Sequence, residues 1–190
     1  MRIRDCSLRY GDNVLFEHFD LTVEDNELIL FVAPSGYGKT TLFRAIAGLV
    51  TPAHGTIEDV GVVAYAFQEP RLLPWYSAVD NVSLVRDDRP KEEARALLLS
   101  LGLTAEACEQ KADELSGGMR QRVNLARSFY YEGDILLLDE PFAGLDEANA
   151  GLVMKEILRQ KVSRPVLMIS HERDFDAYAD RIISMEAARS

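Results

Sequence analysis

The amino-acid sequence predicts an α/β fold built around a mainly parallel β-sheet. Short apolar runs, of which residues 28–33 and 135–139 are the clearest, predict strands that are covered on both faces. Helical patterns follow these runs, as at residues 40–49 and 147–160. Strands that alternate with helices join through right-handed crossovers into a parallel sheet. Ligands of such sheets bind beyond the carboxyl ends of the strands, so we expect the functional residues there.

The N-terminal part departs from this alternation. Residues 2–10 and 19–23 predict two strands separated by the turn Gly11-Asp12-Asn13, which indicates an antiparallel β part. Further strands of the parallel sheet are predicted at residues 62–67, 166–170 and 182–185.

The segment after residue 67 changes in character. It carries three prolines between residues 68 and 90 and a helical stretch at residues 91–101. A further helix is expected to follow Ser116-Gly117-Gly118 and to run to about residue 131. We therefore expect one domain over residues 1–190. Its core would comprise residues 1–67 and 132–190, and residues 68–131 would form a small, mostly helical subdomain.

Composition excludes several classes of protein. A length of 190 residues suits one domain with a sizeable core. The net charge of −10 argues against nucleic acid as the main ligand, because phosphate backbones require basic faces. Cys6 and Cys108 do not make a disulfide framework and are expected to be reduced thiols. The apolar runs are far shorter than the ~18 residues of a membrane span, so the chain is not expected to cross a membrane itself.

Residues 33–40, Ala-Pro-Ser-Gly-Tyr-Gly-Lys-Thr, form a phosphate-binding loop. They match the pattern G-x-x-x-x-G-K-[ST] except at the first position, which is Ala33. Gly36 and Gly38 allow the backbone N–H groups to form a concave anion site, Lys39 reaches the β- and γ-phosphates, and Thr40 contributes a hydroxyl to Mg²⁺. Alanine at position 33 matters only if that position requires a positive φ angle.

Two further features concern phosphate chemistry. The strand at residues 135–139 ends in Asp139-Glu140, of which Asp139 is suited to hold Mg²⁺ and Glu140 to polarise an attacking water. Two solvated carboxylates at a strand end are the alternative. Ser116-Gly117-Gly118 opens a helix, whose free N–H groups and dipole offer a second place for a phosphate. A chain with two such ends indicates that two copies sandwich nucleotides between them.

Together these motifs resemble an ATP-binding-cassette (ABC) ATPase, the nucleotide-binding subunit of an ABC transporter, over nearly the whole chain. The resemblance implies a P-loop NTPase fold. It likens residues 33–40 to Walker A, Gln68 to the Q-loop glutamine, Leu115–Gln121 to the LSGGQ signature, residues 135–140 to Walker B, residues 143–146 to the D-loop and His171 to the switch histidine. Tyr10 resembles the aromatic residue that stacks on adenine.

The resemblance implies ATP and Mg²⁺ as ligands and assigns a role to each matching residue. The implied catalytic residues are Glu140, His171 and Gln68. The implied Mg²⁺ residues are Thr40, Gln68 and Asp139. The implied nucleotide-binding residues are Tyr10, Ser35, Gly36, Tyr37, Gly38, Lys39, Thr40, Thr41, Ser116, Gly117, Gly118 and Asp146. Alternatives remain open at this stage: Tyr10 as a core aromatic, Gln68 as a turn residue and His171 as a polar strand end.

Residues 67–75 are similar to those of nitrate, sulfonate and taurine importers. In such subunits a groove, here near residues 68–85, receives an integral-membrane permease subunit, although Leu72, Leu73 and Trp75 packing within their own subdomain is the alternative. Arg120, Arg122 and Arg127 are expected to be solvated or salt-bridged.

The function that follows from the resemblance is ATP hydrolysis coupled to transport. ATP would close a head-to-tail homodimer and hydrolysis would release it, energising solute transport through the permease. The protein would lie peripherally on the cytoplasmic face of the bacterial inner membrane. The alternatives are a non-catalytic ATP-binding regulator and a soluble ABC ATPase that is not linked to transport.

Overall fold

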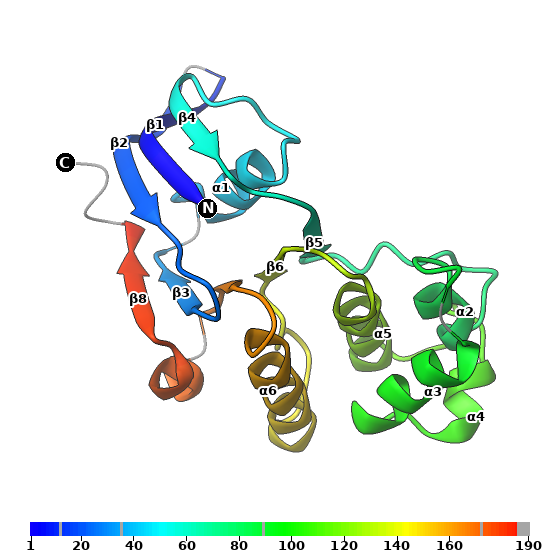
Figure 1. Ribbon diagram of the computed structural model, residues 1–190. Helices are drawn as coiled ribbons and strands as arrows, with labels where there is room; N and C mark the ends of the chain where they lie inside the picture. The colour runs from blue at the N-terminus through cyan, green and yellow to red at the C-terminus, as the bar shows by residue number, and fades with distance from the viewer. Residues whose placement is uncertain (12, 35, 89, 172, 186–190) are drawn as a thin grey trace.

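Two β-sheets and a set of helices make up the fold (Figure 1). The computed structural model describes residues 1–11, 13–34, 36–88, 90–171 and 173–185, and only the backbone of Tyr10, Arg173 and Asp174. Its strands are β1 (Arg2–Tyr10), β2 (Asn13–Thr22), β3 (Leu28–Val32), β4 (His54–Glu58), β5 (Val63–Ala66), β6 (Ile135–Asp139), β7 (Val166–Ile169) and β8 (Arg181–Ser184). Its helices are α1 (Lys39–Ile46), α2 (Ala78–Ser83), α3 (Lys91–Ser100), α4 (Ala105–Glu109), α5 (Gly117–Tyr130), α6 (Glu147–Lys161) and the 3-10 helix η1 (Arg173–Tyr178).

The larger sheet is parallel, as predicted from the apolar runs. Its five strands lie in the order β5-β6-β7-β3-β8, and each neighbouring pair is parallel. All residues of β6 and β7 are buried, and β3 is buried except at its last residue. The expected α/β fold class is confirmed.

The smaller sheet is antiparallel, with the order β2-β1-β4. The strand predicted at residues 19–23 begins at Asn13 instead, because bulges interrupt the alternation of β2 against β1. Strand β4 was not predicted. It is short, almost wholly exposed and contains Gly55 at a φ angle of +79°, so it lacks the apolar alternation by which strands are recognised.

The helices begin and end near the predicted residues, with three additions, α2, α4 and the 3-10 helix η1. Helix α1 ends at Ile46 rather than residue 49, since Gly48 has a φ angle of +70° after it. Helices α2 and α4 were not predicted as separate elements because each has six residues or fewer. Ser77 and Thr104 cap them, and each hydroxyl accepts a hydrogen bond from the backbone N–H three residues later, that of Asp80 and Ala107 respectively.

The parallel sheet separates two hydrophobic clusters, because successive side chains of a strand point to opposite faces. Leu28 and Leu30 of β3 belong to one cluster, and Ile29 and Phe31 to the other. The first cluster includes the helical segment. There α5 lies between the parallel sheet and the helices α2, α3 and α4 (Figure 1), with contacts to β5 and β6 and to α2 and α3.

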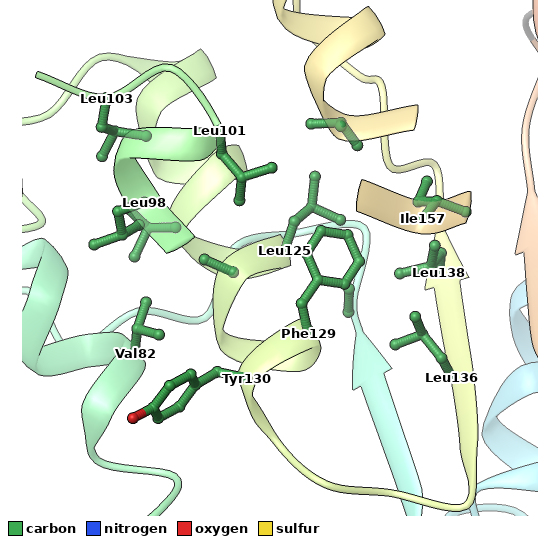
Figure 2. Packing of buried hydrophobic residues seen from close by; sticks show 14 of the residues in the cluster. Val82, Leu98, Leu101, Leu103, Leu125, Phe129, Tyr130, Leu136, Leu138 and Ile157 are labelled. Atoms are coloured by element: carbon green, nitrogen blue, oxygen red, sulfur yellow. The ribbon is translucent and has the colours of Figure 1, made fainter. Parts of the chain in front are cut away.

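Helix α5 is buried along most of its length. In Figure 2, Leu125 and Phe129 of α5 lie beside Leu138 of β6 and Ile157 of α6, while Val82 of α2 lies on the other side. A helix enclosed in this way holds its polar residues in a fixed relation to the sheet. Among the described residues, no helix combines the length and the apolar character needed to cross a bilayer.

Candidate nucleotide-binding site

One cavity of about 670 Å³ gathers most of the predicted site residues at the carboxyl ends of β3, β6 and β7. The predicted residues that line it are Gly36, Tyr37, Gly38, Lys39, Thr40, Thr41, Gln68, Asp139, Glu140 and His171. Residues 13–15, which the sequence did not single out, line it as well. They come from the start of β2, next to the described end of β1 at Tyr10.

The phosphate loop leads directly from β3 into α1. Gly36 and Gly38 both have a φ angle of +84°, which favours glycine, and a Cβ at Gly38 would lie 3.0 Å from the Cβ of Leu15. No side chain caps α1, so its first N–H groups remain available to an anion.

Lys39 is buried at the base of this loop. Its Nζ donates hydrogen bonds to the carbonyls of Ala33, at 2.5 Å, and Pro34, at 3.0 Å. Burial lowers the pKa of Lys39, and nearby Glu140 and Asp139 oppose that change. Ala33 is not among the described non-glycine residues with a positive φ angle, so its backbone conformation does not require glycine.

Asp139 is the last residue of β6 and is almost fully buried, at 2% exposure. Its Oδ2 accepts a hydrogen bond of 3.4 Å from the Tyr65 hydroxyl, and its Oδ1 has no hydrogen-bond partner. Burial raises the pKa of Asp139, against hydrogen bonds from Thr40 and Tyr65. A buried carboxylate oxygen without a partner, close to a hydroxyl, fits a hard divalent cation such as Mg²⁺.

Glu140 has a φ angle of +53°, a conformation that non-glycine residues seldom adopt and that costs about 1–3 kcal/mol. Its N–H donates to the Ile169 carbonyl at 2.9 Å, which joins it to the end of β7. His171, two residues further along, places Nε2 3.1 Å from Glu140 Oε1. Burial raises the pKa of Glu140, and His171 opposes that change. The two side chains therefore contact each other at the cavity wall.

Four predicted residues lie outside this cavity. Ser116 and Asp146 cap α5 and α6, accepting hydrogen bonds from the N–H groups of Met119 at 3.3 Å and Asn149 at 2.8 Å. A Cβ at Gly117 would meet no atom within 4 Å, whereas one at Gly118 would lie 3.0 Å from the Gly144 carbonyl oxygen. The start of α5 thus packs against the turn before α6, apart from the cavity beside α1. Ser35 and the side chain of Tyr10 lie outside the described residues.

Asn81, which is buried in α2, forms hydrogen bonds with the main chain of the loop after Gln68. The Asn81 carboxamide bonds both the N–H and the carbonyl of Leu73, at 2.8 and 3.1 Å. Leu72 packs against the core, whereas Trp75 is 67% exposed. The alternative that Leu72, Leu73 and Trp75 pack within their own subdomain therefore holds for Leu72, whereas Leu73 and Trp75 are exposed.

The prediction that all three arginines of α5 are solvated or salt-bridged is wrong for two of them. Arg120 is exposed as expected. Arg122 Nη1 donates instead to the Leu101 carbonyl at 3.0 Å and to Asn149 Oδ1 at 2.9 Å, and Arg127 Nη1 donates to the Arg71 carbonyl at 2.8 Å. Burial lowers the pKa of both guanidinium groups. Because α5 is enclosed, its arginines bind the oxygen atoms of the segments that enclose it.

The family model described as "ABC transporter" matches residues 16–143 of this chain. The chain belongs to the ABC transporter family. It is 44% identical to the aliphatic sulfonates import ATP-binding protein SsuB 1 of Rhodococcus jostii (strain RHA1), over 86% of this chain and 69% of that protein. It is therefore an ATP-binding and ATP-hydrolysing subunit of ABC transporter type.

Solved structures agree with this ABC ATPase fold. A putative ABC transporter ATP-binding protein from Pyrococcus furiosus superposes with a TM-score of 0.89 at 27% identity, covering 100% of this chain and 98% of that one. The ATP-binding cassette MJ0796, solved as a dimer in a post-hydrolysis state with ADP and Pi, gives a TM-score of 0.82 at 25% identity, over 96% and 93% of the two chains.

Proposed function

We propose that the cavity beside α1 binds ATP with Mg²⁺ and that two copies of the chain enclose each nucleotide head to tail. The observation that carries this proposal is the convergence of Lys39, Asp139, Glu140 and His171 on one cavity at an uncapped helix N-terminus. These groups provide a cation for phosphate, a ligand for a metal ion and a base for water.

Six side chains of the cavity have a defined role in this proposal. The Lys39 ammonium exchanges its carbonyl partners for β- and γ-phosphate oxygens, and the N–H groups at the start of α1 bind the same phosphates. Thr40 and Asp139 would hold Mg²⁺, with Gln68 beside them, and bound Mg²⁺ would neutralise charge on the phosphates. Glu140 accepts a proton from the attacking water. His171 holds the Glu140 carboxylate and contacts the γ-phosphate.

The partner copy would supply the remaining contacts. Ser116-Gly117-Gly118 presents the N-terminus of α5, and Gly117 leaves room there for a phosphate group. Asp146, at the neighbouring turn, would face the same interface. ATP joins the two copies, and its hydrolysis removes the bridge, so dimerisation follows the nucleotide state.

The exposed residues after Gln68 are the proposed contact with a membrane permease. Leu73, Trp75 and Tyr76 present apolar surface on a loop that Asn81 holds rigid, an arrangement suited to a partner helix. We place the protein on the cytoplasmic face of the bacterial inner membrane. From the similarity to SsuB proteins we propose import of an organic sulfonate or a related small anion.

The test compares the wild type with Glu140→Gln. We expect wild-type ATP turnover with Mg²⁺, and in the variant a loss of turnover by about 10²-fold or more with ATP binding retained, because only the proton acceptor is removed. Light scattering with ATP should show the variant as a dimer. A variant that turns ATP over like the wild type would contradict the role of Glu140. Tight ATP binding by the wild type without turnover, also with permease present, would favour a non-catalytic regulator.

A further inference from the structure

Helix α5 carries three polar side chains along one face, at intervals of three residues: Gln121, Asn124 and Arg127. Gln121 and Asn124 are buried, with exposures of 3% and 1%. All three donate hydrogen bonds to main-chain carbonyls outside the helix. Burying a carboxamide is costly unless it is hydrogen-bonded, so these bonds determine which segments can pack against α5.

Gln121 binds the segment that carries Glu140. Its Nε2 lies 3.2 Å from the Glu140 carbonyl oxygen and 3.4 Å from that of Pro141. The Ala143 N–H also donates to the Glu140 carbonyl, at 3.2 Å. The Glu140 carbonyl thus accepts two hydrogen bonds, which support the residue in its left-handed conformation.

Asn124 and Arg127 bind the segment that carries Gln68. Asn124 Nδ2 donates to the Phe67 carbonyl at 2.9 Å, on the peptide that links Phe67 to Gln68, and Arg127 bonds the Arg71 carbonyl. The Arg71 guanidinium in turn lies 5.0 Å above the Phe67 ring. Both ends of the turn that contains Gln68 are therefore attached to α5.

We propose that Gln121 and Asn124 are positioning residues for ATP hydrolysis, which hold Glu140 and Gln68 in register with the first turn of α5. Residues 117–124 lie in one uninterrupted helix, so a shift at its N-terminus would be transmitted to the segments that carry Glu140 and Gln68. Engagement of Ser116-Gly117-Gly118 by the partner's nucleotide then aligns both side chains on the attacking water. This inference rests on the proposed head-to-tail dimer and adds the route by which the signature turn controls catalysis.

The test uses Gln121→Met and Asn124→Leu, which keep the side-chain volume and remove the donor. Ser128→Ala is the matched control, because Ser128 is buried on the same helix and its hydroxyl donates to the Leu125 carbonyl of that helix, at 2.8 Å. For each protein we would measure kcat, KM for ATP, ATP affinity and Tm, with kcat normalised to the concentration of nucleotide-binding sites so that unfolded protein does not contribute.

We expect kcat to fall by about 10- to 100-fold in Gln121→Met and Asn124→Leu, because misplacement by about 1 Å has effects of that size. ATP affinity should stay within about threefold of the wild type, and Ser128→Ala should keep its kcat. Unchanged kcat in both variants, or losses that follow ATP affinity instead, would overturn the inference. Failure of the proposed function is distinct, because then the wild type itself shows no turnover.

Discussion

The starts of α1 and α5 are two helix N-termini with glycine at or next to the capping position, yet they are built differently. Helix α1 has Gly38 in the capping position, no side-chain cap and a buried lysine as its first residue, all beside a cavity lined by ionisable groups. Helix α5 has a Ser116 cap and no charged side chain at its first two positions, and it lies outside that cavity. In the proposed function, the start of α1 would hold the chemistry within the chain, while the start of α5 would offer a surface to a second copy.

The largest expected effect concerns the start of α1. Lys39→Ala should lower ATP turnover by about 10³-fold and weaken ATP binding, because a buried cation aimed at the phosphates is removed. Turnover assays and calorimetric titration with ATP would measure both. Arg44→Ala, in the same helix but outside the cavity lining, is the control and should bind ATP normally. Turnover retained in Lys39→Ala would remove the basis for placing the chemistry at α1.

The second prediction distinguishes the role of the start of α5 from that of the start of α1. Gly117→Asp should lower turnover by about 10²-fold, because its carboxylate repels the partner's phosphate groups. The monomer should keep its Tm or gain slightly, since the site is open and an acidic residue at a helix N-terminus is favourable. Turnover, ATP binding by the monomer and Tm would be measured for Gly117→Asp and for the wild type. Loss of monomer ATP binding would mean that α5 contributes to the site of its own chain.

A smaller effect is expected at Asp139, the proposed Mg²⁺ ligand. Tyr65→Phe removes the hydroxyl that bonds Asp139 Oδ2 and keeps the ring that stacks on Phe67 at 4.0 Å. We expect the Mg²⁺ concentration for half-maximal turnover to change by about two- to fivefold, the effect of losing one weak hydrogen bond. A Mg²⁺ titration of turnover at saturating ATP measures it. An identical titration curve would assign Tyr65 to packing alone.

The smallest effect concerns the antiparallel sheet, away from both helix starts. His18 Nδ1 lies 2.6 Å from Asp5 Oδ1, and His54 Nε2 lies 3.0 Å from Asp5 Oδ2. The hydrogen bond to Asp5 raises the pKa of His18. Its contribution to stability is therefore complete below the unfolded pKa of about 6.5 and is lost as pH rises through the higher folded value.

Thermal melts between pH 5.5 and 8.5 would test this. Relative to the wild type, His18→Gln should show a slightly lower Tm at the acid end and no difference at the alkaline end, because these side chains are exposed and screened by solvent. ATP turnover should not change. A Tm difference that grows with pH would show that the His18 pair stabilises through its neutral form instead.

The outcome at particular residues shows how far sequence reasoning reached. The phosphate loop and the strand end at Asp139-Glu140 were predictable because each is a contiguous run with a local physical meaning. The bonds from Asn124 to Phe67 and from Gln121 to Glu140 were not, since they join residues 57 and 19 positions apart. No local pattern distinguishes a buried carboxamide that binds a distant carbonyl from one in contact with water. The same limit explains the error at Arg122 and Arg127.

The α/β class, the phosphate loop and the starts of the principal helices follow from the sequence, through apolar periodicity, glycine and proline positions and neighbouring functional groups. The family follows from the resemblance of the motifs to those of ABC ATPases. Only the folded chain shows that His171 meets Glu140, that Asp139 keeps an unpartnered oxygen and that α5 binds the segments that carry Glu140 and Gln68. The reason is that a parallel sheet brings together the carboxyl ends of strands that are distant in the chain, and the contacts there depend on register and packing.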